Sequence, residues 1–134
     1  MIRRYAVYGM EDGQISRVVG IIDDNDLIRD SLCDLVETAG IEVQCLASAH
    51  SFLESDLRGK VACLILDIRM PRMSGLELQA RLKREECNIP IIFISAHNDP
   101  EIHAQAIRDG AVAFLAKPFD HQLLLKILRA TLDK

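Results

Sequence analysis

The chain has 134 residues, of which 49% are hydrophobic and only 4% aromatic, so it can form one domain with an aliphatic core. Its formal net charge of −4 argues against a nucleic-acid-binding surface, which normally appears as a basic stripe. No apolar run reaches the roughly 18 residues that a membrane span requires, and there is no signal-peptide pattern. We therefore expect a cytoplasmic protein.

Residues 1–16 show no recognisable element, because Gly9, Asp12 and Gly13 interrupt the apolar positions. We expect this segment to be a flexible or loosely attached N-terminal extension, followed by one domain over residues 17–134.

Five short aliphatic runs in the remainder predict β-strands. They cover residues 18–22, 41–46, 61–66, 91–94 and 113–115. None alternates cleanly between apolar and polar residues, as expected for a parallel sheet covered on both faces.

Apolar residues at helical spacing follow each strand. The predicted helices cover residues 27–39, about 48–55, a segment opening at 74–77, 99–110 and 120–132. Ser74 and Glu77 form a capping-box pattern, and Asp99 followed by Pro100 is typical of a helix start. Strands alternating with helices predict an α/β fold, a doubly wound five-stranded parallel sheet with five helices.

Polar side chains follow four of the five predicted strands, at the sheet edge where open parallel sheets carry their functional sites. They are Asp23, Asp24, Asp67, Ser95 and Lys117. Each alone has an ordinary structural explanation, such as a helix cap or a surface charge. Their occurrence together at one edge predicts a functional site.

The chemistry of these groups is that of phosphoryl transfer. Crowded carboxylates repel one another, and a hard cation such as Mg²⁺ relieves the repulsion. Asp67 is the central carboxylate and the natural nucleophile, while Lys117 can neutralise phosphoryl oxygens. Ser95 can donate a hydrogen bond to an oxygen that arrives later.

Several motifs around these residues carry a family resemblance. They are Asp23-Asp24, Asp67 with Met70-Pro71 and Ser74-Gly75, Ser95-Ala96, and Lys117-Pro118-Phe119. Over residues 17–132 the chain resembles the response-regulator receiver domains of two-component systems, typified by the bacterial chemotaxis regulator. Residues 67–119 are most similar to receivers that precede LuxR-type helix-turn-helix output domains. The resemblance implies a flavodoxin-like fold with strand order 2-1-3-4-5.

The resemblance also implies the metal site and the phosphodonor. Asp24 and Asp67 would bind Mg²⁺ directly, with Mn²⁺ as an alternative, together with the backbone carbonyl of Arg69. Asp23 would act through water. Asp67 would accept a phosphoryl group from a sensor histidine kinase or a phosphotransfer protein.

Further roles implied by the resemblance concern switching. Ser95 and Lys117 would bind the phosphoryl oxygens, and the bond between Lys117 and Pro118 would be cis. Ser95 and the aromatic Phe114 would form the switch. Since a phenylalanine has no hydroxyl to anchor an outward ring, we expect Phe114 to favour the inward state.

The resemblance places the output of the switch on the face formed by the fourth helix, fifth strand and fifth helix. This face could pair with itself in a phosphorylation-dependent homodimer. Arg69 and His97 border the phosphoryl group in such domains and are expected to modulate its lifetime. The alternative for these two residues is that they are ordinary exposed loop side chains.

Other interpretations remain open. Asp24 followed by Asn25-Asp26-Leu27 resembles the nucleophile motif of haloacid-dehalogenase-type phosphatases, but that would leave Asp67 without a role. A receiver-like binding module that works without phosphorylation is a second alternative. No output domain follows residue 132, so we expect a stand-alone receiver or a regulatory fragment, with no direct nucleic-acid binding by these residues.

Four cysteines occur singly along the chain. They are Cys33, Cys45, Cys63 and Cys87. None has the close pairing of a zinc site, and we expect buried, reduced thiols.

Overall fold

The computed structural model describes residues 17–97 and 99–133, so the expectation for residues 1–16 lies outside the described residues. The elements follow one another in regular alternation. In chain order they are β1 (Val18–Ile22), α2 (Asp26–Thr38), β2 (Val43–Leu46), α3 (Ala49–Glu54), the 3₁₀ helix η1 (Leu57–Gly59), β3 (Val61–Asp67), α4 (Gly75–Arg84), β4 (Ile91–Ser95), α5 (Pro100–Arg108), β5 (Ala113–Ala116) and α6 (His121–Leu132).

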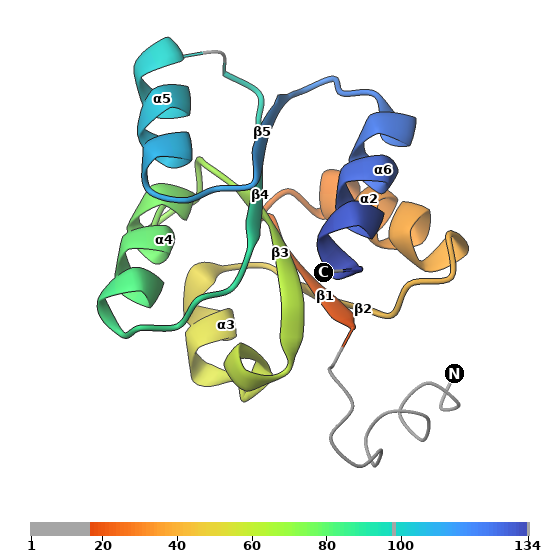
Figure 1. Ribbon diagram of the computed structural model, residues 1–134, viewed down its shortest axis with the longest axis horizontal. Helices are drawn as coiled ribbons and strands as arrows, with labels where there is room; N and C mark the ends of the chain where they lie inside the picture. Colours follow the sequence, from red (N-terminus) through yellow and green to blue (C-terminus); the bar gives the residue numbers. More distant parts are fainter. Residues whose placement is uncertain (1–16, 98, 134) are drawn as a thin grey trace.

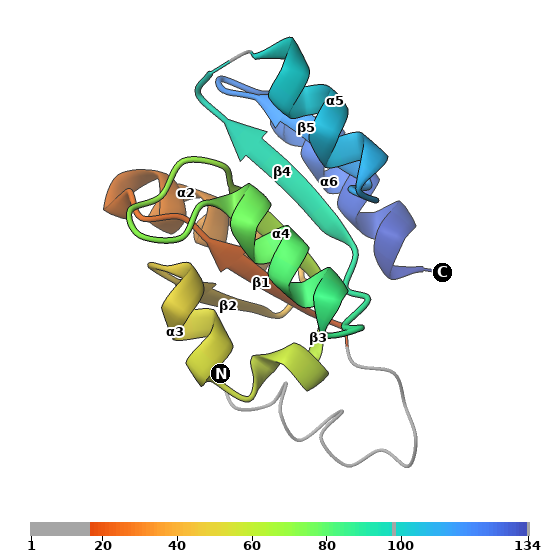
Figure 2. The same ribbon diagram turned by 90° about the vertical axis from the view of Figure 1, so that its left-hand side faces the viewer.

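The five strands form one parallel sheet in the order β2-β1-β3-β4-β5, which confirms the predicted topology. Helices α2 and α6 cover one face, and α3, α4 and α5 cover the other (Figures 1 and 2). The strand order reverses between β1 and β3, so the functional crevice is expected where these two strands end.

Side chains of the central strands point alternately to two apolar layers. Ile21 and Ile65 pack under α2 and α6 in one cluster, whereas Ile22 and Leu64 belong to the cluster under α3, α4 and α5. All four side chains are fully buried. Burial on both faces explains why the strands read as continuous apolar runs.

Element boundaries differ from the sequence predictions by one or two residues. β2 starts at Val43 instead of residue 41, and β3 and β4 extend by one residue to include Asp67 and Ser95. The 3₁₀ helix η1 was not predicted. The capping box of Ser74 and Glu77 is confirmed, with both hydrogen bonds present.

The expectation of four reduced thiols is wrong for two of them. Cys33 of α2 and Cys45 of β2 form a disulfide with their Cα atoms 6.5 Å apart, whereas Cys63 and Cys87 are free. The separation of twelve residues along the sequence did not indicate a disulfide, because the two sulfurs approach each other only when α2 packs beside β2.

No helix within residues 17–97 and 99–133 is long and apolar enough to cross a bilayer.

Candidate functional site

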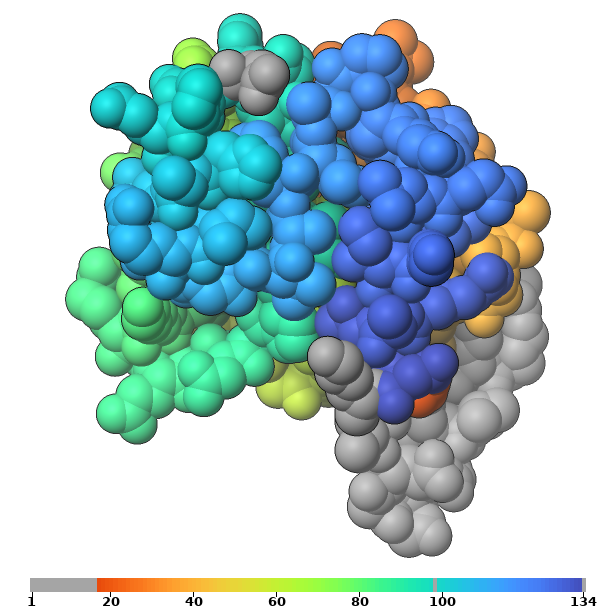
Figure 3. All heavy atoms as spheres, turned by 45° about the horizontal axis from the view of Figure 1, so that its top comes forward, coloured from red at the N-terminus to blue at the C-terminus, as the bar shows by residue number. Residues whose placement is uncertain are grey.

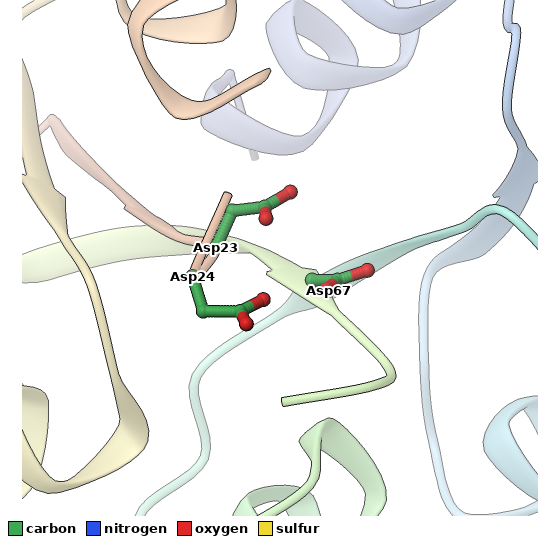
Figure 4. A group of neighbouring side chains, drawn as sticks. All are labelled: Asp23, Asp24 and Asp67. Carbon is green, nitrogen blue, oxygen red and sulfur yellow. The ribbon is translucent and has the colours of Figure 1, made fainter. Parts of the chain in front are cut away.

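Three carboxylates meet at the carboxyl ends of β1 and β3. One oxygen each from Asp23, Asp24 and Asp67 lies within 4.8 Å of the others (Figure 4). Asp23 and Asp67 are buried, and Asp24 is exposed. The sequence predicted this convergence, which arises because the two strands are hydrogen-bonded neighbours.

Lys117 supplies the positive charge of the site. Its Nζ lies 3.3 Å from Oδ2 of Asp23 and 3.3 Å from Oδ1 of Asp67, and its side chain is 14% exposed. The backbone N–H of Lys117 donates to the carbonyl of Ser95 at 2.7 Å, which attaches the start of the loop to β4. The peptide bond between Lys117 and Pro118 is cis, as predicted.

The acidic environment perturbs Asp67. Burial, followed by the nearby charge of Asp23, raises its pKa from 3.8 to about 6, with a smaller contribution from Asp24, while Lys117 acts in the opposite direction. The carboxylate form of Asp67 is therefore stabilised by any cation that enters the site. This electrostatic state suits a nucleophile that becomes active when a metal binds.

The hydroxyl of Ser95 is engaged by its own loop. Ser95 Oγ donates to the carbonyl of His97 and accepts from the N–H of His97, both at 3.0 Å. Ser95 is buried, whereas His97 is exposed. Any bond from Ser95 to an incoming phosphoryl oxygen must replace its bond to the His97 carbonyl.

Arg29, which the sequence analysis did not identify, stabilises the acidic loop after β1 by hydrogen bonds to two of its residues. Its Nη1 donates to the carbonyl oxygen of Asp23 at 2.8 Å, and its Nη2 donates to Oδ1 of Asp26 at 2.6 Å. Asn25 caps α2 by accepting from Ile28 N–H. The sequence feature that could have indicated this role of Arg29 is its position, one turn into a helix that follows an acidic loop.

Gly75 was named in the sequence motif without a structural role. Its N–H donates to the carbonyl of Ile68 at 2.8 Å. A Cβ at this position would overlap the backbone carbonyl oxygen of Asp67 and would lie 3.1 Å from the Cα of Ile68. Glycine therefore allows the start of α4 to pack directly on the backbone of the candidate acceptor.

The remaining predicted residues do not belong to the group of converging carboxylates. Arg69 follows two residues after Asp67 and is exposed. Phe114 lies on β5, three residues before Lys117, and is half-buried. Its ring stacks on the ring of His103 in α5, a partner that sequence reasoning did not identify.

The donor set fits a hard divalent cation. Carboxylate oxygens within 4.8 Å of one another can converge on one ion, and oxygen ligands are those that Mg²⁺ and Mn²⁺ prefer. Asp23, Asp24 and Asp67 would hold such an ion, and the Lys117 ammonium lies 3.3 Å from one oxygen each of Asp23 and Asp67.

A parallel sheet of order 2-1-3-4-5 with helices on both faces places the chain in the class of flavodoxin-like α/β domains, here with an acidic cluster, a hydroxyl and a lysine at the carboxyl edge of the sheet. The chain belongs to the response regulator receiver domain family, whose model matches residues 19–129. It is thus a receiver domain of the kind found in two-component systems.

Similar proteins are response regulators. The chain is 46% identical over 115 residues to the response regulator protein TodT of Pseudomonas putida. The match covers 86% of this chain and 51% of TodT. It is 36% identical over 116 residues to the transcriptional regulatory protein FixJ of Azorhizobium caulinodans, covering 87% of this chain and 55% of FixJ. The chain spans about half the length of the curated relatives it matches.

Solved structures show the same fold. The response regulator StyR superposes with a TM-score of 0.80 at 41% identity, covering 87% of this chain and 59% of StyR. The structure of FixJ-N superposes with a TM-score of 0.80 at 33% identity, covering 92% of this chain and 96% of that one.

Proposed function

We propose that the chain accepts a phosphoryl group on Asp67 from a sensor histidine kinase or phosphotransfer protein, in a Mg²⁺-dependent reaction. The observation that carries this proposal is the position of Asp67. It stands at the end of β3 with two further carboxylates within 4.8 Å and the Lys117 ammonium 3.3 Å from its Oδ1.

Phosphoryl transfer from a phosphohistidine to Asp67 requires no oxidant, reductant or second substrate. A carboxylate oxygen of Asp67 attacks the phosphorus of a phosphohistidine, an O–P bond forms, the P–N bond breaks, and the imidazole nitrogen takes up a proton. A bound Mg²⁺ would supply Lewis-acid neutralisation of phosphoryl oxygens. Asp24 and Asp67 would hold that ion directly, together with the backbone carbonyl of Arg69, and Asp23 would act through water.

Phosphorylation adds negative charge and acceptor oxygens next to Ser95 and Lys117. Ser95 then donates to a phosphoryl oxygen in place of the His97 carbonyl, and the loop after β4 is released. Phe114 responds to this change as the switch aromatic. Arg69 and His97, both exposed beside the site, modulate how quickly water removes the phosphoryl group. The domain in this way assists its own phosphorylation and dephosphorylation without acting on a separate substrate.

The signal leaves through the face formed by α5, β5 and α6. Figure 3 shows α5 and α6 on either side of β5 on one surface. Ile107 of α5 and Val112, which directly precedes β5, are large apolar side chains that are 42% and 45% exposed. Exposed apolar side chains of this kind can form contacts with a partner. Self-association through this face after phosphorylation is part of the proposal, as is transmission to an output domain or target.

The phosphodonor approaches beside Lys117. An apolar groove between α2 and the loop after β5 is lined by Ile28, Leu32 and Phe119 and reaches Lys117. Leu27 at its rim is 79% exposed, although it is a large apolar side chain. An apolar groove of this kind suits a helical partner that carries the phosphohistidine. The encounter would take place in the cytoplasm, where such kinases have their catalytic parts.

Intact-mass measurement tests the proposal. The chain is incubated with a small acyl phosphate and Mg²⁺, beside Asp67→Asn and a metal-free sample. We expect a gain of one phosphoryl group in the wild type alone. If the wild type neither gains mass nor responds spectroscopically to beryllofluoride, the phosphorylation-independent binding module becomes the better account.

A further inference from the structure

The ring of Phe114 has two aromatic neighbours. Phe93, its register partner on β4, is fully buried, and the two ring centroids are 6.3 Å apart at 42°. His103 on α5 is exposed, with its ring centroid 4.6 Å from that of Phe114 and the planes only 9° apart. Phe114 therefore contacts one buried aromatic ring and stacks on one exposed imidazole ring.

The helix that carries His103 is itself held in place. Nε2 of Gln79, a buried residue of α4, donates to the backbone carbonyl of Ala106 at 3.1 Å. Ala106 is fully buried one turn from His103, and Ile102 beside it packs against the same apolar cluster. The backbone position of His103 is consequently fixed, so its imidazole can leave the stack only by rotation of its own side chain unless α5 also moves.

We propose that His103 is a positioning residue for the switch, and that its imidazole ring holds Phe114 in the stacked orientation until Asp67 is phosphorylated. The proposal rests on the proposed function, in which Phe114 is the switch aromatic. A phenylalanine has no hydroxyl that could hydrogen-bond at the surface, which on the sequence alone favours the inward state; the stack on His103 supplies an anchor that the sequence did not indicate and opposes that preference.

The strength of such a contact suits a switch. Aromatic pairs of this kind shift an equilibrium by about 2- to 12-fold beyond the burial of their area. A bias of this size populates one orientation in the unmodified protein, yet the phosphoryl group can overcome it. Removing the imidazole should therefore release Phe114 and make the activated state easier to reach.

The test uses the full chain labelled with 4-fluorophenylalanine. The four phenylalanines give four fluorine signals, and Phe114→Leu identifies the one that matters. In His103→Ala we expect the Phe114 fluorine signal to be displaced even without a phosphodonor. We also expect the beryllofluoride concentration at the midpoint of the titration in Mg²⁺ to be about 2- to 12-fold lower than in the wild type. His103→Tyr, which keeps a ring, should behave as the wild type, and so should Gln105→Ala, a control at an exposed position of the same helix.

Each contrary outcome has a distinct meaning. An unchanged Phe114 signal in His103→Ala would overturn the stack as an anchor. A displaced signal with an unchanged beryllofluoride midpoint would overturn the role of His103 in the switch. A wild type that ignores beryllofluoride would overturn the proposed function itself, and the switch role of His103 with it.

Discussion

Asp67 should destabilise the metal-free fold at neutral pH, and Asp67→Asn should relieve this. The folded protein holds the pKa of Asp67 at about 6, above its ordinary value of 3.8, mainly because of burial and the charge of Asp23. A raised folded pKa means that the folded state binds the proton more tightly than the unfolded state. The associated stability is complete below about pH 4 and is lost as the pH rises through about 6.

The magnitude follows from a shift of about two pKa units, which corresponds to about 3 kcal/mol once the pH is well above 6. Asp67 is only 6% exposed, so solvent screening leaves most of this penalty in place. We therefore expect Asp67→Asn to raise the free energy of unfolding by up to about 3 kcal/mol at about pH 8 and by little at about pH 4.

Urea unfolding at several pH values, in the presence of a chelator, measures this difference. Asp34→Asn, at an exposed carboxylate of α2, is the matched control and should change stability by about 0.5 kcal/mol or less. Mg²⁺ should stabilise the wild type far more than Asp67→Asn, because the ion binds only the folded site. A stability difference that is the same at low and high pH would refute the reasoning.

Three further predictions concern neighbouring features. Gly75→Ala should lower the free energy of unfolding by roughly 1–3 kcal/mol, since the new Cβ would overlap the Asp67 carbonyl, and should weaken Mg²⁺ binding measured by titration. Ser95→Ala should weaken beryllofluoride binding by roughly 10- to 100-fold, because a hydrogen bond to a charged group is lost; equal affinities would contradict this. Cys33→Ser should destabilise the oxidised protein by roughly 2–3 kcal/mol and leave the reduced protein nearly unchanged, as judged by urea midpoints with and without a thiol reductant.

The disulfide also bears on where the protein works. Thiols in the cytoplasm are kept reduced, so a protein in that compartment would carry Cys33 and Cys45 mainly as free thiols. The urea midpoint of the reduced protein therefore also measures the stability that the protein would have in the cytoplasm, its proposed location.

The sheet and the edge that carries the candidate site could be predicted because their sequence signals are local. Each strand is an apolar run, and Asp67, Ser95 and Lys117 each follow directly where such a run ends. Parallel strands bring their carboxyl ends to one edge, so the order of elements along the chain was enough to place these side chains together.

The features that were missed depend on contacts between distant parts of the chain. The stack of His103 on Phe114 requires α5 to lie across β5, and the disulfide of Cys33 and Cys45 requires α2 beside β2. The close approach of Gly75 to Asp67 depends on the path of the loop after β3. No periodicity or motif encodes such distances, because they arise only when the elements pack.

The most direct test of the central claim is to locate the phosphoryl group within the chain. The protein is phosphorylated with a small acyl phosphate and Mg²⁺, then treated with borohydride, which reduces an aspartyl phosphate to homoserine, and its peptides are analysed by mass spectrometry. The account predicts homoserine at position 67 and nowhere else. Homoserine at Asp24 would contradict it and favour the phosphatase-like alternative, whereas a phosphorylated protein with no homoserine would exclude an acyl phosphate at Asp67.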